Sequence, residues 1–211
     1  MARVAAHGTG PADYLALGDS YTIGEGVGDD QRWPVQLAAA LRARGIAIAH
    51  PHVIAMSGWT SDELLAAIDE EQAQGQLQPR YGLVSLLIGV NDQYRGRSVD
   101  EYAVHFSGLL DRAIAFAGGD PAHVLVVSIP DWGTTPFAQA SGRDRAQIAR
   151  ELDEYNAVAE AFCQQRGVTW VDITDLTRRP ELAHELVADG LHPSGEMYAL
   201  WVQRFREKIR A

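Results

Sequence analysis

The sequence predicts an α/β fold in which one parallel sheet lies between two layers of helices, a three-layer α/β/α sandwich. Short apolar runs with strand character alternate five times with longer helical patterns, which is typical of parallel strands joined by crossover helices. The run at residues 83–88 is continuously apolar, as expected for a strand that is buried on both faces. No repeat, low-complexity tract or charge block marks a second domain. We therefore expect residues 1–211 to form one domain, with residues 1–11 flexible.

Each predicted strand is an apolar run that ends in a loop rich in small or polar residues. The five strands are predicted at residues 13–17, 46–55, 83–88, 123–129 and 168–172. Pro51 lies inside the second run and is expected to shorten or weaken it, because proline has no backbone N–H.

Helices are predicted between these strands from periodicity and end signals. The first covers residues 33–44 and stops at Gly45. Thr60 with Glu63, and Ser98 with Glu101, have the spacing of a capping box, so a helix is expected to begin at each. The second of these runs to about residue 116. The remaining helices are predicted at residues 143–166, ending before Gly167, and from Ser194 to the end of the chain.

Composition narrows the range of partners. Asp and Glu total 28 against 18 Lys and Arg, which gives a formal net charge of −10. An acidic surface repels phosphate backbones and anionic lipids, so nucleic acid and anionic membranes are not expected as partners. The apolar runs are too short to span a bilayer, and residues 1–11 lack the apolar core of a signal peptide, which predicts a soluble, cytoplasmic protein. Cys163 is the single cysteine, so no internal disulfide can form. The oligomeric state is not predicted.

In parallel α/β folds, ligands bind at the carboxyl ends of the strands, so the loops after the strands are where chemistry is expected. The loop after the first strand carries Gly18-Asp19-Ser20, and Ser20 is the candidate nucleophile. A turn serine after a strand is the plain alternative. The G-x-S-x-G elbow of ordinary α/β-hydrolases is absent from this loop, which disfavours that class.

The last loop carries a candidate base. His192 follows Asp189 by three residues, so one turn can bring the carboxylate to Nδ1–H and leave Nε2 free to take a proton from serine. The alternative is a solvated loop histidine next to a capping aspartate. Gly58 and Asn91, with the backbone N–H of Ser20, are candidate donors for an oxyanion hole, although each also fits an ordinary turn. Together these residues form the set that acyl transfer to water requires.

No cofactor or metal is expected. His50 and His52 are spaced to point to one face of a strand, but a third ligand is not evident near them in the sequence. The glycines at 24, 26 and 28 lack both the G-K-[ST] and the G-x-G-x-x-G patterns of phosphate-binding loops.

The ordered combination of these blocks resembles the SGNH (GDSL) hydrolase family. Gly-Asp-Ser at 18–20, Gly58 in MSGWTSDEL, Gly-x-Asn-Asp at 89–92 and Asp-x-x-His-Pro at 189–193 occur in the family's order. The resemblance spans residues 15–198 and is nearest to the bacterial thioesterase/lysophospholipase/arylesterase branch. It implies a flavodoxin-like, five-stranded parallel sheet. It also implies catalysis by Ser20 and His192 with Asp189 orienting the histidine, and an oxyanion hole formed by Ser20, Gly58 and Asn91.

Two departures from the family pattern stand out. Tyr21 occupies the place of the leucine in the family name, and Ala55-Met56 precede Ser57-Gly58 where many relatives have an asparagine. The first need not disturb Ser20, because this side chain takes no part in the chemistry. The second leads us to expect different support for the Gly58 loop.

The expected function is hydrolysis of short- to medium-chain acyl or aryl esters, with a small-molecule ester as the partner. Trp59, Trp132 and Phe137 follow the second and fourth strands and are candidates for the walls of the acyl pocket. The loop at residues 131–142 is a candidate lid. The alternatives are a carbohydrate O-deacetylase with the same residues, a thioesterase or lysophospholipase, and a non-catalytic binding domain. Chain length and the choice between oxygen ester and thioester are not predicted.

Overall fold

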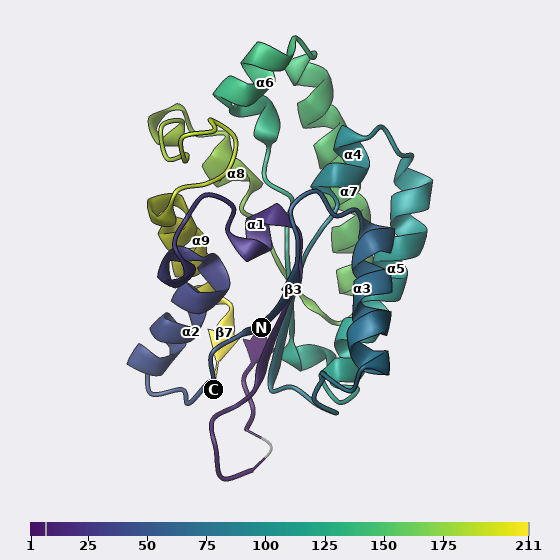
Figure 1. Ribbon diagram of the computed structural model, residues 1–211, viewed down its shortest axis with the longest axis vertical. Helices are drawn as coiled ribbons and strands as arrows, with labels where there is room; N and C mark the ends of the chain where they lie inside the picture. Colours follow the sequence, from purple (N-terminus) through teal and green to yellow (C-terminus); the bar gives the residue numbers. More distant parts are fainter. Residues whose placement is uncertain (7, 211) are drawn as a thin grey trace.

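A computed structural model describes residues 1–6 and 8–210 and contains the predicted parallel sheet (Figure 1). Its five strands are all parallel and lie in the order β3-β2-β4-β5-β6. The strands are β2 (Tyr14–Gly18), β3 (His52–Ala55), β4 (Leu83–Leu87), β5 (Val124–Val127) and β6 (Thr169–Val171). The chain winds outward from β2 in one direction and from β4 in the other, so the strand order reverses between these two strands. Loops that follow strands next to such a reversal form the usual ligand crevice of an open α/β sheet.

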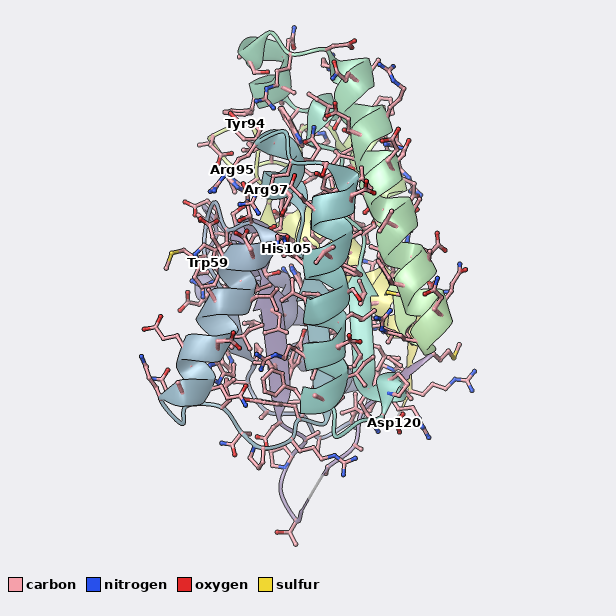
Figure 2. All side chains as sticks on the ribbon, turned by 90° about the vertical axis from the view of Figure 1, so that its right-hand side faces the viewer. Trp59, Tyr94, Arg95, Arg97, His105 and Asp120 are labelled. Atoms are coloured by element: carbon pink, nitrogen blue, oxygen red, sulfur yellow. The ribbon has the colours of Figure 1, made fainter. Side chains whose placement is uncertain are left out.

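Helices cover both faces of the sheet, which confirms the predicted three-layer sandwich (Figure 1). Helices α2 and α9 pack together on one face, while α3, α5 and α7 cover the other face, which Figure 2 turns toward the viewer. The α-helices are α1 (Ser20–Ile23), α2 (Trp33–Ala43), α3 (Ser61–Ala73), α4 (Val90–Tyr94), α5 (Val99–Phe116), α6 (Pro136–Ser141), α7 (Arg145–Arg166), α8 (Thr174–Thr177) and α9 (Gly195–Glu207). The short 3-10 helices are η1 (Asp29–Gln31), η2 (Pro121–His123), η3 (Trp132–Thr134) and η4 (Pro180–Leu182).

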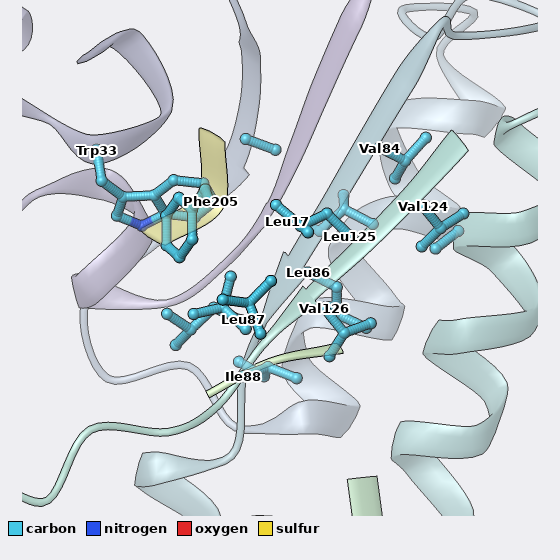
Figure 3. Close-up of a cluster of buried hydrophobic side chains, with 14 of the residues drawn as sticks. Leu17, Trp33, Val84, Leu86, Leu87, Ile88, Val124, Leu125, Val126 and Phe205 are labelled. Atoms are coloured by element: carbon cyan, nitrogen blue, oxygen red, sulfur yellow. The ribbon is translucent and has the colours of Figure 1, made fainter. Parts of the chain in front are cut away.

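The centre of the sheet is apolar because helices exclude water from both of its faces. Every residue of β2, β4 and β5 is buried. Figure 3 shows side chains of these strands, including Leu17, Leu86 and Val126, gathered in one cluster. Trp33 of α2 and Phe205 of α9 meet edge to face beside it, with ring centroids 5.3 Å apart. The continuous apolar run in the sequence therefore marks the middle of the sheet.

Both predicted capping boxes are present. The Ser98 hydroxyl accepts a bond from the N–H of Glu101, whose carboxylate accepts one from the N–H of Ser98, each 3.1 Å long. Glu63 in turn accepts a 2.8 Å bond from the N–H of Thr60. These bonds satisfy N–H groups that the first turn of a helix leaves without partners, and so they determine where α5 and α3 begin.

One strand prediction needs correction. The strand predicted at residues 46–55 is formed only at its end, as β3, and Ile48 makes just an isolated bridge to Ala12. Pro51 precedes β3, and its missing N–H accounts for the shortening.

Residues 1–11, predicted to be flexible, include one short strand. This segment includes His7, which lies outside the described residues. Ala2–Arg3 form the strand β1, which pairs in parallel with β7 (Ile209–Arg210). The N–H of Ala2 donates to the carbonyl of Lys208 at 2.8 Å. The two ends of the chain are therefore tied together.

The segment at residues 131–142, predicted as a loop, is largely helical and forms η3 and α6. Asp131 and Thr135 cap these short helices through hydrogen bonds to the N–H groups of Gly133 and Ala138. Within residues 1–6 and 8–210, every helix is too short or too polar to cross a lipid bilayer.

Candidate active site

Ser20 lies directly after the first central strand, where β2 ends at Gly18. A Cβ atom at Gly18 would lie 2.1 Å from Oγ1 of Thr22 and 2.6 Å from the carbonyl oxygen of Leu87, so only glycine fits at this turn. Asp19 then accepts a 3.0 Å hydrogen bond from the N–H of Tyr21 and caps α1, of which Ser20 is the first residue. The turn therefore holds the Ser20 hydroxyl at the carboxyl edge of the sheet.

The Ser20 hydroxyl is hydrogen-bonded to His192, 172 residues away in the chain. His192 Nε2 lies 3.0 Å from Ser20 Oγ, and His192 Nδ1 lies 2.6 Å from Oδ2 of Asp189. The other Asp189 oxygen accepts bonds from the backbone N–H groups of Leu191 (2.8 Å) and His192 (3.0 Å). The turn thus orients the carboxylate as well as the imidazole. This is the geometry in which an imidazole can take a proton from a serine hydroxyl.

Asp189 is held as a carboxylate. Burial raises its pKa, but the hydrogen bonds from the His192 side chain and from the backbone N–H groups lower it further, so that the net pKa lies below the ordinary value. A charged Asp189 can stabilise a protonated His192 imidazole, the species that forms if the imidazole takes a proton from serine.

Three potential donors face the same cavity as Ser20 Oγ. Among the described residues, no acceptor is within hydrogen-bond reach of the backbone N–H of Ser20 or of Gly58. Gly58 has a φ of +86°, a conformation that side chains rarely allow, and this explains the glycine. The Asn91 side chain donates one N–H to the carbonyl of Trp59 at 2.9 Å and retains a second hydrogen on Nδ2. These groups can stabilise the oxyanion of a tetrahedral intermediate.

The cavity beside the triad has a volume of about 220 Å³. Ser20, Gly58, Asn91 and His192 form its polar side. Its remaining surface is mostly apolar and includes Tyr21, Val90, Tyr94, Trp132, Phe137 and Leu191. A carbonyl group can therefore reach the triad while an acyl or aryl group fills the apolar part.

The chain is similar to a known protein family and to solved structures. The model of the GDSL-like lipase/acylhydrolase family matches residues 16–200. The chain belongs to this family. No curated protein matches the chain. The match confirms the resemblance seen in the sequence.

Solved structures share the fold. A protein named TesA is 21% identical with a TM-score of 0.71, covering 92% of this chain and 96% of that one. The psychrotrophic esterase EstA from Pseudoalteromonas sp. is 18% identical with a TM-score of 0.67, covering 93% and 95%. Axe2, an acetylxylan esterase from Geobacillus stearothermophilus, is 18% identical with a TM-score of 0.69, covering 96% and 98%. These likenesses show the shared fold, and the family match identifies the chain as a carboxylic ester hydrolase of the GDSL family.

The aromatic pocket candidates of this GDSL hydrolase divide into two groups. Trp132 and Phe137 line the cavity, but Trp59 is not part of the lining that the described residues form. Trp59 is half-buried against the hydrophobic core, and only its carbonyl reaches the site, through Asn91. Position in a loop after a strand does not determine the direction of a side chain, which is why the sequence cannot separate these cases.

Sequence reasoning missed Tyr94, an aromatic residue of the cavity wall. Its ring packs against Trp132 and Phe137, with centroid distances of 5.4 and 6.4 Å. Tyr94 belongs to α4, a helix too short for its periodicity to stand out, and Figure 2 shows it near the upper end of α5. The spacing from Asn91 could have predicted Tyr94 as a cavity residue, because side chains three residues apart on a helix lie on the same face.

Residues that resemble a metal site in this GDSL hydrolase have other partners. Nε2 of His52 pairs with Glu71 at 2.9 Å. Asp62, Asp92 and His105 have ligand atoms within 4.8 Å of one another, but Arg97 lies 2.5 Å from Asp62 and 3.6 Å from Asp92. The guanidinium already pairs with both carboxylates, and its positive charge would repel a metal cation.

Two carboxyl groups lie fully buried behind the site. Burial, with a smaller contribution from the nearby Asp92 carboxylate, raises the pKa of Asp19 to about 8, against the hydrogen bond from the N–H of Tyr21. Burial also raises the pKa of Asp92, against hydrogen bonds from the side chain and N–H of Ser61. Among the described residues, none donates a bond to Oδ2 of Asp19. Asp19 is therefore held mainly in its neutral form at neutral pH.

Proposed function

We propose that the chain hydrolyses short- to medium-chain acyl or aryl esters through an acyl-Ser20 intermediate. The proposal is carried by the hydrogen-bonded series Asp189–His192–Ser20, which opens into a largely apolar cavity. A cavity of about 220 Å³ is smaller than the roughly 300–1,000 Å³ that drug-sized ligands occupy, which favours small acyl groups.

The reaction begins when His192 Nε2 takes the Ser20 proton and Ser20 Oγ attacks the ester carbonyl. The tetrahedral oxyanion accepts hydrogen bonds from the N–H groups of Ser20 and Gly58 and from the Asn91 amide. Asp189 stabilises the imidazolium meanwhile. His192 then donates its proton to the departing alkoxide, and the acyl group remains on Ser20.

The second half repeats these steps with water. His192 takes a proton from a water molecule, whose oxygen attacks the acyl-Ser20 carbonyl. Collapse of the second tetrahedral intermediate releases the acid and returns the proton to Ser20 Oγ. The enzyme is regenerated with no other reactant than ester and water.

Removal of triad residues tests the proposal. With p-nitrophenyl acetate, Ser20→Ala and His192→Ala should each lose roughly 10⁶-fold in kcat, because nucleophile and base act as a unit. Asp189→Asn should lose less, since both reacting groups remain in place. A fluorophosphonate probe should label the wild type at Ser20 and leave Ser20→Ala unlabelled. Near-native hydrolysis by Ser20→Ala would overturn the proposal.

A carbohydrate O-deacetylase acting through the same residues is the second candidate. It is favoured by the shared fold with a protein described as an acetylxylan esterase. Higher kcat/KM on acetylated xylooligosaccharides than on p-nitrophenyl acetate would select it. Preference for an acyl-CoA or a lysophospholipid in the same panel would select a thioesterase or a lysophospholipase instead.

A further inference from the structure

Two segments that supply the oxyanion donors are joined along their length by side chains. One is the Gly58 loop, residues 56–60, together with the start of α3; the other is α4 with residues 95–97. Asn91 donates to the Trp59 carbonyl, Asp92 accepts from the N–H and hydroxyl of Ser61, and Arg97 pairs with Asp62. Each of these bonds fixes the start of α3, or Trp59 two residues before it, relative to α4 or to the residues that follow α4.

Arg95 makes the bond that reaches farthest into the Gly58 loop. Its Nη2 donates to the carbonyl of Gly58 at 2.7 Å, and its Nη1 lies 3.4 Å from Oε1 of Glu63. The other Glu63 oxygen accepts from the N–H of Thr60 at 2.8 Å. Figure 2 shows Arg95 and Arg97 close together above the start of α3, with Trp59 beside it. One guanidinium therefore ties both ends of the 58–60 turn.

The turn needs such a tie because Gly58 is conformationally free. It has no side chain to pack, and its φ of +86° lies in the region that glycine leaves and enters most easily. The Gly58 N–H and the Gly58 carbonyl flank the same Cα, so a guanidinium on the carbonyl restricts the direction in which the N–H points. The Gly58 carbonyl is thus held by Arg95, while the Gly58 N–H stays available to an oxyanion.

We infer that Arg95 is a positioning residue for the oxyanion hole, which orders the Gly58 N–H through the Gly58 carbonyl. This inference rests on the proposed function. Arg95 is not among the described residues that line the cavity, and it reaches the site through the Gly58 carbonyl. Asn91 and Arg95 are four residues apart and extend from the same face of α4. The same short helix therefore positions both the Asn91 amide and, through Arg95, the Gly58 N–H.

The test compares the effects of Arg95→Ala on kcat and on KM. We expect kcat on p-nitrophenyl acetate to fall roughly 10- to 100-fold with KM within about twofold of wild type, because the donor acts mainly in the transition state. Arg95→Lys should recover part of the loss. Millimolar guanidinium ion, far below denaturing concentrations, should raise kcat of Arg95→Ala and leave the wild type unchanged.

Arg112→Ala is the matched control. Arg112 also bridges to α3, through Asp69 and Gln72, and it is similarly exposed, but it contacts no residue of the Gly58 loop. Its kcat should equal that of wild type even if its thermal midpoint falls as much as that of Arg95→Ala.

Two results would overturn the inference. One is an unchanged kcat in Arg95→Ala. The other is an equal loss in Arg112→Ala with no rescue of Arg95→Ala by guanidinium. Ser20→Ala, measured alongside, separates this inference from the proposed function. Wild-type turnover in Ser20→Ala would overturn the function itself, whereas its inactivity together with full kcat in Arg95→Ala would overturn only the role of Arg95.

Discussion

The two carboxyl oxygens of Asp19, the residue before Ser20, have different surroundings. One carboxyl oxygen caps α1 by accepting from the N–H of Tyr21, and the other is buried with no partner among the described residues. A charged carboxylate in this place would lack the hydrogen bonds that compensate for lost hydration. The neutral acid avoids that cost, which is the physical reason for the raised pKa.

This raised pKa predicts a pH dependence of stability. The folded-state pKa of about 8 exceeds the unfolded value of 3.8, so the folded protein binds more protons between them. The contribution of Asp19 to the free energy of unfolding is fully present below the unfolded value and is lost as pH rises through about 8. Urea unfolding at several pH values should show this decline in the wild type and a smaller one in Asp19→Asn, which retains an oxygen for Tyr21. Equal slopes in the two proteins would contradict the raised pKa.

Individual residues were predictable where their chemistry and chain position coincide. Ser20, Gly58 and Asn91 each follow a strand within a few residues, whereas Asp189 and His192 lie beyond α8 and η4, in the turn before α9. Each is a residue type that ester hydrolysis requires. Arg95 was not predictable as support for the Gly58 loop, although the missing asparagine before Ser57 indicated that such support would differ. The two partners are 37 residues apart, and an exposed arginine after a short helix has many possible acceptors.

Short helices account for most of the differences at the scale of secondary structure. Helices α1 and α4 have four and five residues, too few for a periodic apolar face to show in the sequence. Tertiary contacts stabilise them, since a helix of this length is not stable alone. Both carry site residues at or near their first turn, so the missed helices are also those that orient the donors.

Helix α6 forms part of the cavity wall and is tied to the catalytic turn. The N–H of Phe137 donates to the carbonyl of Gly190 at 3.1 Å, between Asp189 and His192 in the chain. Residues 131–142 therefore connect the pocket to the triad through α6, and their helical structure differs from the irregular loop predicted.

Truncation of Phe137 tests the role of this wall. Phe137→Ala should enlarge the cavity and move the best p-nitrophenyl ester toward longer acyl chains, because the ring occupies space beside Tyr94 and Trp132. The change should appear as a higher kcat/KM for longer esters relative to the acetate. Gln139→Ala, at an exposed position of the same helix, is the control. An unchanged chain-length profile would show that Phe137 does not limit the acyl group.

At the scale of the whole molecule, the central strands β2, β4 and β5 position the loops at their carboxyl ends. Leu86 of β4 lies next to Leu17 of β2 on one side and Val126 of β5 on the other, and it is fully buried. The loops with Ser20 and Asn91 begin within a few residues of these strands. The packed sheet centre therefore determines how far apart Ser20 and Asn91, the candidate nucleophile and the candidate amide donor, are held.

Loss of packing at this centre should be costly. Leu86→Ala should lower the free energy of unfolding by about 2–5 kcal/mol, since neighbouring strands cannot close the cavity left behind. Val104→Ala, at a 71% exposed position of α5, should change it by less than about 0.5 kcal/mol. Urea unfolding monitored by tryptophan fluorescence gives both values. Similar stabilities of the two variants would contradict the assignment of Leu86 to the core.

The sequence by itself determined the α/β class, the five strands and the loops that carry the reacting residues, because burial and turn formation leave local patterns of hydrophobicity, glycine and capping residues. Only the tertiary structure decided the strand order, the union of Ser20 with His192 in one hydrogen bond, and which aromatic rings face the cavity. These three features depend on contacts between segments that are far apart in the chain, and such contacts produce no local sequence pattern from which they could be predicted.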